Sequence, residues 1–514
     1  MSNYAVILKR NVVANLIRYF IVFAIAFYLT PVVVGALGDS GYGVWVLVYS
    51  FIGYAGIFEM GIMPATVKLI SQFASPEMVA QRNAVANTAI VFYVGLGTIT
   101  CILFWTAFIP IMYSMVGESL DLDELTVFSR IVGLDAFVSF ATYPFMGIAY
   151  GMHQYHRQSQ RDIFVGIANL LGSVTVLHFG WGLLGLACVK LGSSVLGFVV
   201  LVIMCRDSFS RISFSLNCIT RSALKDLLRL GFSLFIVQTL TRVNNYAIPV
   251  LITVYRNAAM TAYFSVAQTL VGRLLELLWS ASAPFMPVFS EISSAKEKEA
   301  EAEGRLKSIY IRGSRLIIAC SIPLYLLLFS LGPSFLGAWV GSTYTNHAGL
   351  PMRILVLEMV VIGFQPLLER MMVGQGQMRT YILALTIGNV GGFALLLCLV
   401  NPYGLEGVAA ACLVRSLCVQ FALFVHMCNK QLITVKEYFG ECILPWGYAA
   451  GLQALSLWLM SKYSSSEGIV PIITMGAISI LPYTAGVFCV LSPEERVSLW
   501  HNLRKISALF QGSK

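Results

Sequence analysis

The chain has 514 residues, of which 58% are hydrophobic and only 11% are charged. An ordinary soluble domain carries about 25% charged residues, so this composition excludes a soluble globular enzyme. It also excludes a disordered chain, because disordered chains are poor in apolar residues. The formal net charge is +9. Because the basic residues separate apolar segments and form no patch, this excess does not indicate nucleic-acid binding.

Long uncharged segments recur along the whole chain and predict an all-α polytopic membrane protein. A helix needs about 20 apolar residues to cross a bilayer. The apolar runs between charged or turn-rich breaks predict about fourteen transmembrane spans. In chain order they are 12–37, 43–66, 84–112, 125–150, 162–179, 183–205, 224–254, 258–289, 308–333, 350–373, 380–400, 404–428, 439–461 and 468–491.

The distribution of the 34 Lys and Arg residues supports this count. With a cytoplasmic N-terminus, 25 of them fall on predicted cytoplasmic segments and 4 on outer segments, as the positive-inside rule expects. One missed span would invert every later loop and abolish this bias. We therefore predict that both termini are cytoplasmic. The remaining 5 cations lie within predicted spans and are Arg18, Lys190, Arg242, Arg273 and Arg415.

The loops are too short to fold alone, so we expect any binding site to lie between helices. Residues 492–514 form a predicted cytoplasmic tail. Its apolar residues Leu499, Leu503, Ile506 and Phe510 share one helical face among basic residues. This pattern is typical of an interfacial helix on the inner leaflet; a helix that binds a soluble partner is the alternative.

Short patterns recur at an offset of 222 or 223 residues. The matched pairs are Arg130 and Arg353, Asp135 and Glu358, Gly151 and Gly374, Gln154 and Gln377, Gly182 and Gly404, and Met204 and Met427. The offset places predicted spans 4–6 on spans 10–12. Because six is an even number of crossings, the two repeats enter the membrane in the same orientation, as parallel repeats do.

The repeat divides the chain into predicted parts. They are an N-terminal lobe (1–206, six spans), a C-terminal lobe (207–430, six spans), a terminal pair of spans (431–491) and the tail (492–514). A cavity between two such lobes could open to each side in turn, so this architecture favours a transporter.

Several segments resemble the Wzx-type polysaccharide flippases of the multidrug/oligosaccharidyl-lipid/polysaccharide (MOP) exporter superfamily. They are Asn15, the turn Leu37-Gly38-x-x-x-Tyr42-Gly43, the segment Glu59-x-Gly61-Ile62, and the turn that begins with Gly182-Leu183. The resemblance implies a MATE-like, V-shaped pair of lobes in the bacterial inner membrane. It also implies a cargo, an undecaprenyl-diphosphate-linked oligosaccharide, which is flipped from the cytoplasmic to the outer leaflet by alternating access for cell-surface polysaccharide biosynthesis.

The resemblance also implies roles for particular parts of the chain. In the related lipid II flippases, arginines on helices 1 and 8 contact the diphosphate, and Arg18 and Arg273 lie on the matching spans here. The last two helices of those proteins form a groove for the lipid tail, which would correspond to residues 439–491. The implied partners are the lipid-linked saccharide, membrane lipid, a coupling proton or sodium ion, and other polysaccharide assembly proteins.

The charges within the predicted spans are candidate functional residues, because a charge at mid-bilayer costs about 2.5–3.5 kcal/mol on insertion scales. Guanidinium groups bind phosphate oxygens in a bidentate way. We predict that Arg18, Arg242 and Arg273 line the cavity and hold the diphosphate. The alternatives are snorkelling to the interface and, for Arg273, neutralisation by Glu276 on the same helix face.

Acidic residues are candidates for coupling or gating. Glu59 precedes Pro64, a predicted helix bend, and is either a coupling acid or a partner of Lys68. The repeat-related acids Asp135 and Glu358 either gate the lobes or have a capping role. Arg130 and Arg353 each precede one of these acids by five residues, which places them about 140° away around the helix. We therefore expect neither arginine to be the partner of its acid.

Two further cations complete the candidate set. Lys190 and Arg415 lie at near-equivalent depth in the sixth and twelfth spans, and either reach the cavity or brace their lobe. The pair His153-x-x-His156 lies in a basic loop without nearby Cys or carboxylate, so we expect no metal site. We expect no cofactor either, since the chain has no nucleotide-binding glycine loop.

Two other function classes fit the sequence less well. A cation-coupled multidrug exporter of the same superfamily would favour acids in its cavity, whereas the arginines here favour an anionic cargo. A membrane-embedded glycan polymerase or ligase would need a sizeable outer loop, and none is predicted. We therefore expect a transporter and not an enzyme.

Overall fold

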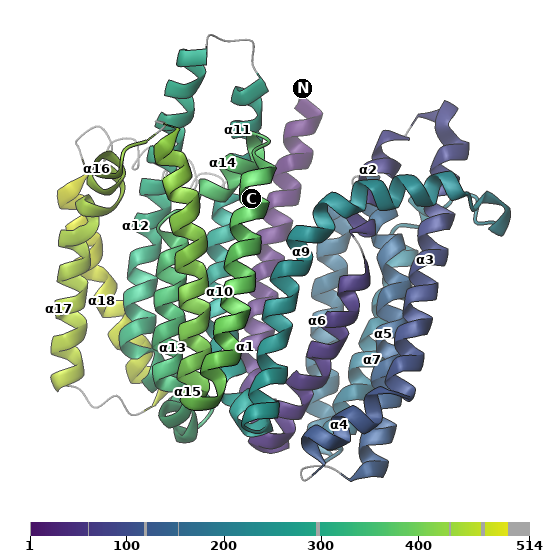
Figure 1. Ribbon diagram of the computed structural model, residues 1–514. Coiled ribbons are helices and arrows are strands. Elements are labelled where there is room, and N and C mark those ends of the chain that lie inside the picture. Colours follow the sequence, from purple (N-terminus) through teal and green to yellow (C-terminus); the bar gives the residue numbers. More distant parts are fainter. Residues whose placement is uncertain are drawn as a thin grey trace, which may run out of the picture. The chain divides into compact units, whose positions relative to one another are not determined.

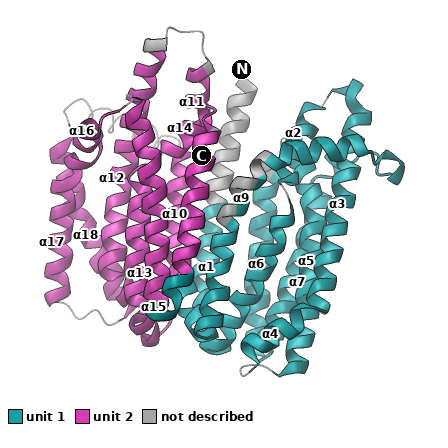
Figure 2. Cartoon of the chain, in the orientation of Figure 1, with its two compact units in different colours: residues 1–266, 397–404 teal, residues 267–396, 405–514 magenta. Residues whose placement is uncertain are grey.

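The computed structural model describes residues 2–59, 61–73, 75–117, 121–152, 154–294, 299–430, 433–463 and 468–491. Within these residues the chain forms helices joined by turns, and they contain no β-strand, which confirms the all-α prediction. The predicted tail 492–514 and His153 lie outside the described residues, as does the side chain of His156. The chain divides into two compact units, drawn in different colours in Figure 2.

Unit 1 comprises Met1–Val266 and Leu397–Gly404. Its helices are α1 (Ser2–Ala55), α2 (Ile62–Gln72), α3 (Val79–Trp105), α4 (Phe108–Val116), α5 (Leu122–Gly151), α6 (Tyr155–His178), α7 (Gly182–Met204), α8 (Arg206–Phe209), α9 (Arg221–Tyr255) and the start of α10 (Ala258–Ser282). Helix α5 packs between α3 and α7, and α6 packs on α7 and α1 (Figure 1). Tyr93, Phe104 and Phe128 lie in its buried clusters.

Unit 2 comprises Ala267–Leu396 and Leu405–Lys514. Its helices are the rest of α10, α11 (Phe285–Ser294), α12 (Glu299–Trp339), α13 (Ser342–Gly363), α14 (Leu368–Gly374), α15 (Met378–Asn429) apart from its segment Leu397–Gly404, α16 (Val435–Tyr438), α17 (Gly447–Tyr463) and α18 (Ile469–Val490). Helix α12 packs on α13, and α17 packs on α18 (Figure 1). Leu331, Leu457 and Met475 form a buried apolar cluster among α12, α17 and α18.

The helices accommodate the fourteen predicted spans. Eight helical segments of the described chain are long and apolar enough to cross a membrane, and α13 with α14, bent by 43°, makes a ninth. Helices α1 and α15 each contain two predicted spans, with breaks at Gly38 (φ 69°) and Gly404 (φ 57°). The more polar helices α6, α9 and α10 match the remaining three spans.

The repeated turn motif begins with glycine in both copies because the backbone there has a positive φ angle. Gly182 has φ 54° and Gly404 has φ 57°, both in the left-handed region that side chains disfavour. Gly182 begins α7, and Gly404 begins the second half of α15. The same backbone turn is therefore built twice, once in each repeat.

The second predicted span, 43–66, is broken in the structure. Helix α1 ends at Ala55, one 3-10 turn covers Gly56–Glu59, and α2 begins at Ile62. Gly61 has φ 67°, and a Cβ there would lie 2.5 Å from the carbonyl oxygen of Gly231. Pro64 therefore lies in the first turn of α2, where a missing N–H is tolerated, and does not bend a continuous helix as predicted.

The repeat extends to two short helices that lie outside the matched sequence patterns. At the same offset α2 corresponds to α11, and each packs on a repeat-related glycine. A Cβ on Gly151 would lie 2.7 Å from Cβ of Ile70 in α2, and a Cβ on Gly374 would lie 2.9 Å from Cβ of Phe289 in α11. These glycines are thus required by close packing, once in each unit.

The boundary between the compact units differs from the boundary between the predicted lobes, because the units are defined by packing and the lobes by the sequence repeat. Residues 207–266 belong to unit 1, because α9 packs on α1, α2 and α3. The predicted division into lobes follows the sequence repeat, and it stays a prediction.

Candidate functional site

Arg18 belongs to a charge cluster in unit 1. Its Nη1 lies 3.2 Å from Oδ2 of Asp162 on α6, and Nη1 of Arg161 lies 3.1 Å from Oδ1 of the same carboxylate. Gln158 donates to that carboxylate oxygen at 2.8 Å. Two guanidinium groups therefore share one carboxylate, which leaves an excess of one positive charge in the trio of Arg18, Arg161 and Asp162.

The two arginines of this trio differ in exposure. The Arg161 side chain is 14% exposed, and its Nε donates to the carbonyl of Gly197 at 2.8 Å. The Arg18 side chain is 37% exposed. Arg161 lies just before the predicted span 162–179, on its cytoplasmic side, and neither Arg161 nor Asp162 is among the predicted site residues. The adjacent Arg161 and Asp162 at the start of that span are the sequence signal for this cluster.

Arg242 and Glu59 form a second ion pair in unit 1. Nη1 of Arg242 on α9 lies 3.5 Å from Oε2 of Glu59 and donates to the carbonyl of Gly56 at 2.6 Å. The hydroxyl of the fully buried Tyr93 donates to Oε1 of Glu59 at 3.0 Å. Within the described residues no ion pair joins Glu59 to Lys68, the alternative partner. The break at Gly56–Glu59 exposes the backbone carbonyl that holds Arg242.

Asp135 on α5 is 2% exposed and is held by α7 and α1. The Ser194 hydroxyl donates to Oδ1 at 2.5 Å, and the Tyr49 hydroxyl donates to Oδ2 at 3.4 Å. Lys190 lies on α7 one helical turn before Ser194. The hydrogen bond from Ser194 to Asp135 thus joins α7 to α5.

Glu358 on α13 is held by α15 in the same way. Nη2 of Arg415 donates to Oε1 at 3.0 Å, and the Ser416 hydroxyl donates to the same oxygen at 2.7 Å. The side chains of Arg415 and Glu358 are only 17% and 12% exposed. The acid, the serine and the cation therefore brace unit 2 internally.

Arg273 and Glu276 lie on α10 in unit 2, one turn apart. Nη1 of Arg273 lies 3.1 Å from Oε2 of Glu276, and both side chains are partly exposed. The structure thus brings together Arg242 with Glu59, Arg273 with Glu276, and Arg415 with Glu358. Arg18 and Arg242 belong to unit 1, and Arg273 belongs to unit 2. Among the described residues, no group of three or more His, Cys, Asp or Glu could hold a metal ion.

Comparison with known protein families decides the identity of the chain. Residues 8–293, more than half of the chain, match the family described as "Polysaccharide biosynthesis protein". The chain belongs to this family. A search of curated proteins finds no match.

Solved structures share the fold of this polysaccharide biosynthesis protein. An inward-facing multidrug resistance MATE family transporter of the MOP superfamily is 16% identical, with a TM-score of 0.66 over 80% of this chain and 98% of that one. The lipid II flippase MurJ, in an inward closed conformation, is 15% identical, with a TM-score of 0.71 over 92% and 97%. The MATE transporter VcmN of Vibrio cholerae, in its bent form, is 13% identical, with a TM-score of 0.57 over 85% and 100%.

These likenesses confirm the MOP superfamily fold. Together, the family and the fold support a multi-pass membrane flippase or transporter.

Proposed function

We propose that the protein is a flippase that moves an undecaprenyl-diphosphate-linked oligosaccharide from the cytoplasmic to the outer leaflet of the bacterial inner membrane. Transport would proceed by alternating access and would supply cell-surface polysaccharide biosynthesis. The observation that carries this proposal is the trio of Arg18, Arg161 and Asp162, in which two guanidinium groups share one carboxylate. With two guanidinium groups and one carboxylate, the trio carries a net positive charge, which suits an anionic cargo.

Arg18 is the member of the trio suited to contact the cargo. Its side chain is more exposed than that of Arg161, and the Asp162 carboxylate orients it from one side. A diphosphate offers several charged oxygens to a guanidinium group. Contact with the diphosphate would therefore add to the contact with Asp162 and would not require its loss.

Arg242 pairs with Glu59, and Arg273 pairs with Glu276. We propose that the diphosphate exchanges with these carboxylates as the cargo moves. When Arg242 turns to a phosphate, Glu59 loses this cation and keeps the hydrogen bond from the Tyr93 hydroxyl. A proton or sodium ion from solution would then replace the lost charge, which makes Glu59 the preferred coupling acid.

A cation-coupled multidrug exporter is the second candidate, because MATE transporters share the fold. A cavity for cationic drugs would be expected to present an excess of acid. The Arg18 trio has the opposite balance, so we prefer the lipid-linked saccharide.

Deletion of the gene, followed by analysis of lipid-linked intermediates, tests the proposal. We expect one undecaprenyl-linked oligosaccharide to accumulate on the cytoplasmic side and surface glycan to be lost. Unchanged glycan with raised drug sensitivity would instead support the multidrug exporter.

A double variant tests the arginines themselves. We expect Arg18→Ala with Arg273→Ala to abolish surface glycan in cells that depend on the protein. The matched control is Lys225→Ala with Lys436→Ala, which removes the same charge from two exposed lysines. Normal glycan in the arginine variant, at normal protein abundance, would refute the assigned role.

A further inference from the structure

Asn245 on α9 is an exposed polar residue at membrane depth. It lies within the predicted span 224–254, about 14 Å along the helix from the end of that span, at about 1.5 Å per residue. Its side chain is exposed, and it makes no hydrogen bond or ion pair with the residues that the structure describes. Polar residues within membrane spans almost always face the bundle interior or a water-filled cavity. We therefore expect the Asn245 amide to face water and not acyl chains.

Asn245 and Arg242 lie one turn apart on one face of α9. Residues three positions apart are neighbours on a helix surface, with Cβ atoms about 5–6 Å apart. The Arg242 side chain is 33% exposed and donates to the carbonyl of Gly56 at 2.6 Å. Helix α1 packs on α9 (Figure 1) on the other side of Arg242, where the ring centroids of Tyr246 and Tyr54 lie 6.1 Å apart. The Asn245 amide thus lies beside Arg242 and away from this contact with α1.

The face of α9 that carries Asn245 is buried closer to the predicted outer end. Ile248, Pro249 and Ile252 follow Asn245 within about 60° around the helix, at 100° per residue. All three are buried, and Ile248 and Ile252 are only 2% and 0% exposed. The exposed part of this face therefore ends just beyond Asn245. Alternating access requires such closure toward one side when a cavity is open to the other.

The Asn245 amide and the Arg242 guanidinium group suit different parts of a ligand. A guanidinium group only donates hydrogen bonds, which matches phosphate oxygens. An amide also accepts, and its carbonyl oxygen finds no donor on an ionised phosphate. A sugar hydroxyl both donates and accepts, so it matches the amide. In a lipid-linked saccharide the first sugar is bonded to the diphosphate and therefore lies next to the phosphate-binding group.

We propose that Asn245 is a specificity-determining residue, which hydrogen-bonds to a hydroxyl or N-acetyl group of the sugar next to the diphosphate while Arg242 binds a phosphate. The inference rests on the proposed flippase function and deepens it, because it assigns the junction between sugar and diphosphate to one face of α9. Asn245 follows Arg242 toward the predicted outer end. The sugar therefore lies nearer the closed end of the exposed face than the diphosphate does.

Native mass spectrometry of the full-length protein in mild detergent tests this role. The protein is mixed with equal amounts of undecaprenyl diphosphate and one sugar-bearing form, and the ratio of the two bound species is measured. The sugars are glucose, galactose, N-acetylglucosamine and N-acetylgalactosamine. We expect the wild-type protein to prefer at least one sugar-bearing lipid about three- to tenfold, which corresponds to one hydrogen bond.

Two substitutions at Asn245 separate sugar binding from diphosphate binding. Asn245→Leu should still bind undecaprenyl diphosphate and should lose the preference, whereas Asn245→Gln, which keeps the amide, should retain part of it. Arg242→Gln should weaken the binding of both lipids and leave their ratio unchanged. The matched control Asn346→Leu changes an exposed Asn on α13 and should keep both the binding and the preference.

The outcomes distinguish this role from the proposed function. A preference that Asn245→Leu retains, or equal binding of bare and sugar-bearing lipids by the wild-type protein, overturns the role of Asn245 and leaves the flippase standing. Loss of undecaprenyl diphosphate binding in Asn245→Leu, at normal protein abundance, would place Asn245 on the diphosphate and also overturn it. Wild-type protein that binds none of these lipids would refute the flippase, and the role of Asn245 with it.

Discussion

Ser194 donates a hydrogen bond from α7 to the Asp135 carboxylate on α5, and unit 2 repeats this contact between Ser416 on α15 and Glu358 on α13. The acids are related by the repeat offset, and so are the serines. The cations are not at equivalent positions: Lys190 precedes Ser194 by four residues, whereas Arg415 directly precedes Ser416. Each repeat thus keeps the acid–serine contact and supplies the positive charge from a different turn of the helix.

The acid–serine contacts should stabilise both units to a similar extent. We expect Ser194→Ala and Ser416→Ala each to cost about 1.5–3 kcal/mol, the usual range for a hydrogen bond to a charged group. The measurement is the thermal midpoint of the protein in nanodiscs. Ser461→Ala, which removes an exposed hydroxyl from α17, is the control. An equal decrease in the control would show that the acids do not need these serines.

The Arg415–Glu358 pair should show strong coupling. Arg415→Met leaves a mostly buried carboxylate without its cation, and breaking a buried pair costs about 3–5 kcal/mol. We expect Glu358→Gln to recover much of this loss in the Arg415→Met background. A double-mutant cycle of thermal stability measures the coupling. Simple additivity of the two changes would mean that the pair contributes nothing beyond its separate residues.

The repeat-related packing glycines should not tolerate a side chain. We expect Gly151→Ala and Gly374→Ala to lower stability by about 1–3 kcal/mol through overpacking, because a Cβ would meet Ile70 or Phe289 at less than 3 Å. Gly192→Ala and Gly391→Ala are matched controls within helices and have open space around the new methyl group.

Those two controls should be neutral or should stabilise the protein by about 0.5–1 kcal/mol, since glycine weakens a helix interior. Thermal unfolding and yield of folded protein report both sets. Destabilisation of all four variants alike would contradict the packing explanation.

The predicted orientation can be tested by cysteine labelling. In a background without the eleven native cysteines, Thr343→Cys places a thiol at the predicted outer end of α13 and Ser215→Cys places one in the predicted cytoplasmic loop before α9. Both positions are exposed. A membrane-impermeant maleimide should label the first in intact cells and the second only after permeabilisation. The reverse pattern would invert the topology.

The fold class and the approximate spans followed from local features of the sequence. The length of each apolar run and the side on which cations gather do not depend on which helices meet. The offset of about 223 residues likewise predicted which turns are equivalent, and Gly182 and Gly404 have the same left-handed backbone. The i, i+3 spacing also identified Glu276 as a partner of Arg273, because that pair lies on one helix.

The breaks within spans and most charge partners depended on contacts between distant segments. Gly61 approaches the backbone of Gly231, and no pattern near residue 61 indicates this neighbour. Arg18 reaches Asp162 across 144 residues, and Arg242 reaches Glu59 across 183.

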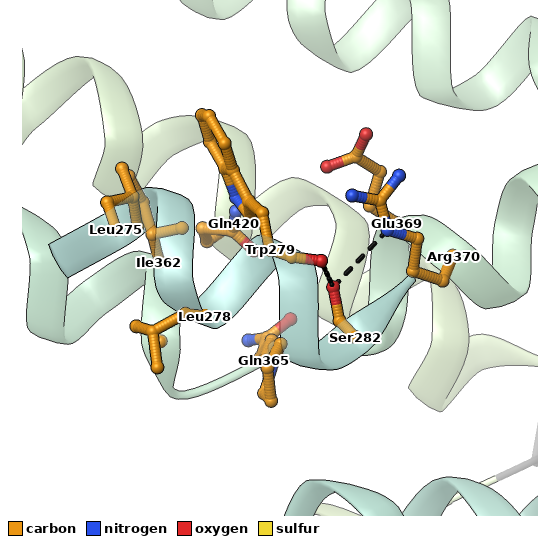
Figure 3. A pocket seen from close by; sticks show the side chains of 11 residues that line it. Leu275, Leu278, Trp279, Ser282, Ile362, Gln365, Glu369, Arg370 and Gln420 are labelled. Atoms are coloured by element: carbon orange, nitrogen blue, oxygen red, sulfur yellow. Dashed lines mark hydrogen bonds between the residues drawn. The ribbon is translucent and has the colours of Figure 1, made fainter. Parts of the chain in front are cut away.

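By itself, then, the sequence determined that this is a helical membrane protein with a parallel repeat and a few intramembrane charges, because hydropathy and charge act along the chain. Only the tertiary structure decided how those charges are compensated. It placed Arg18 and Arg161 beside Asp162, and Arg242 beside Glu59. It also placed polar side chains near Trp279 at the bend between α13 and α14 (Figure 3). The physical reason is that a charge buried in a membrane protein takes whichever partner helix packing brings within reach.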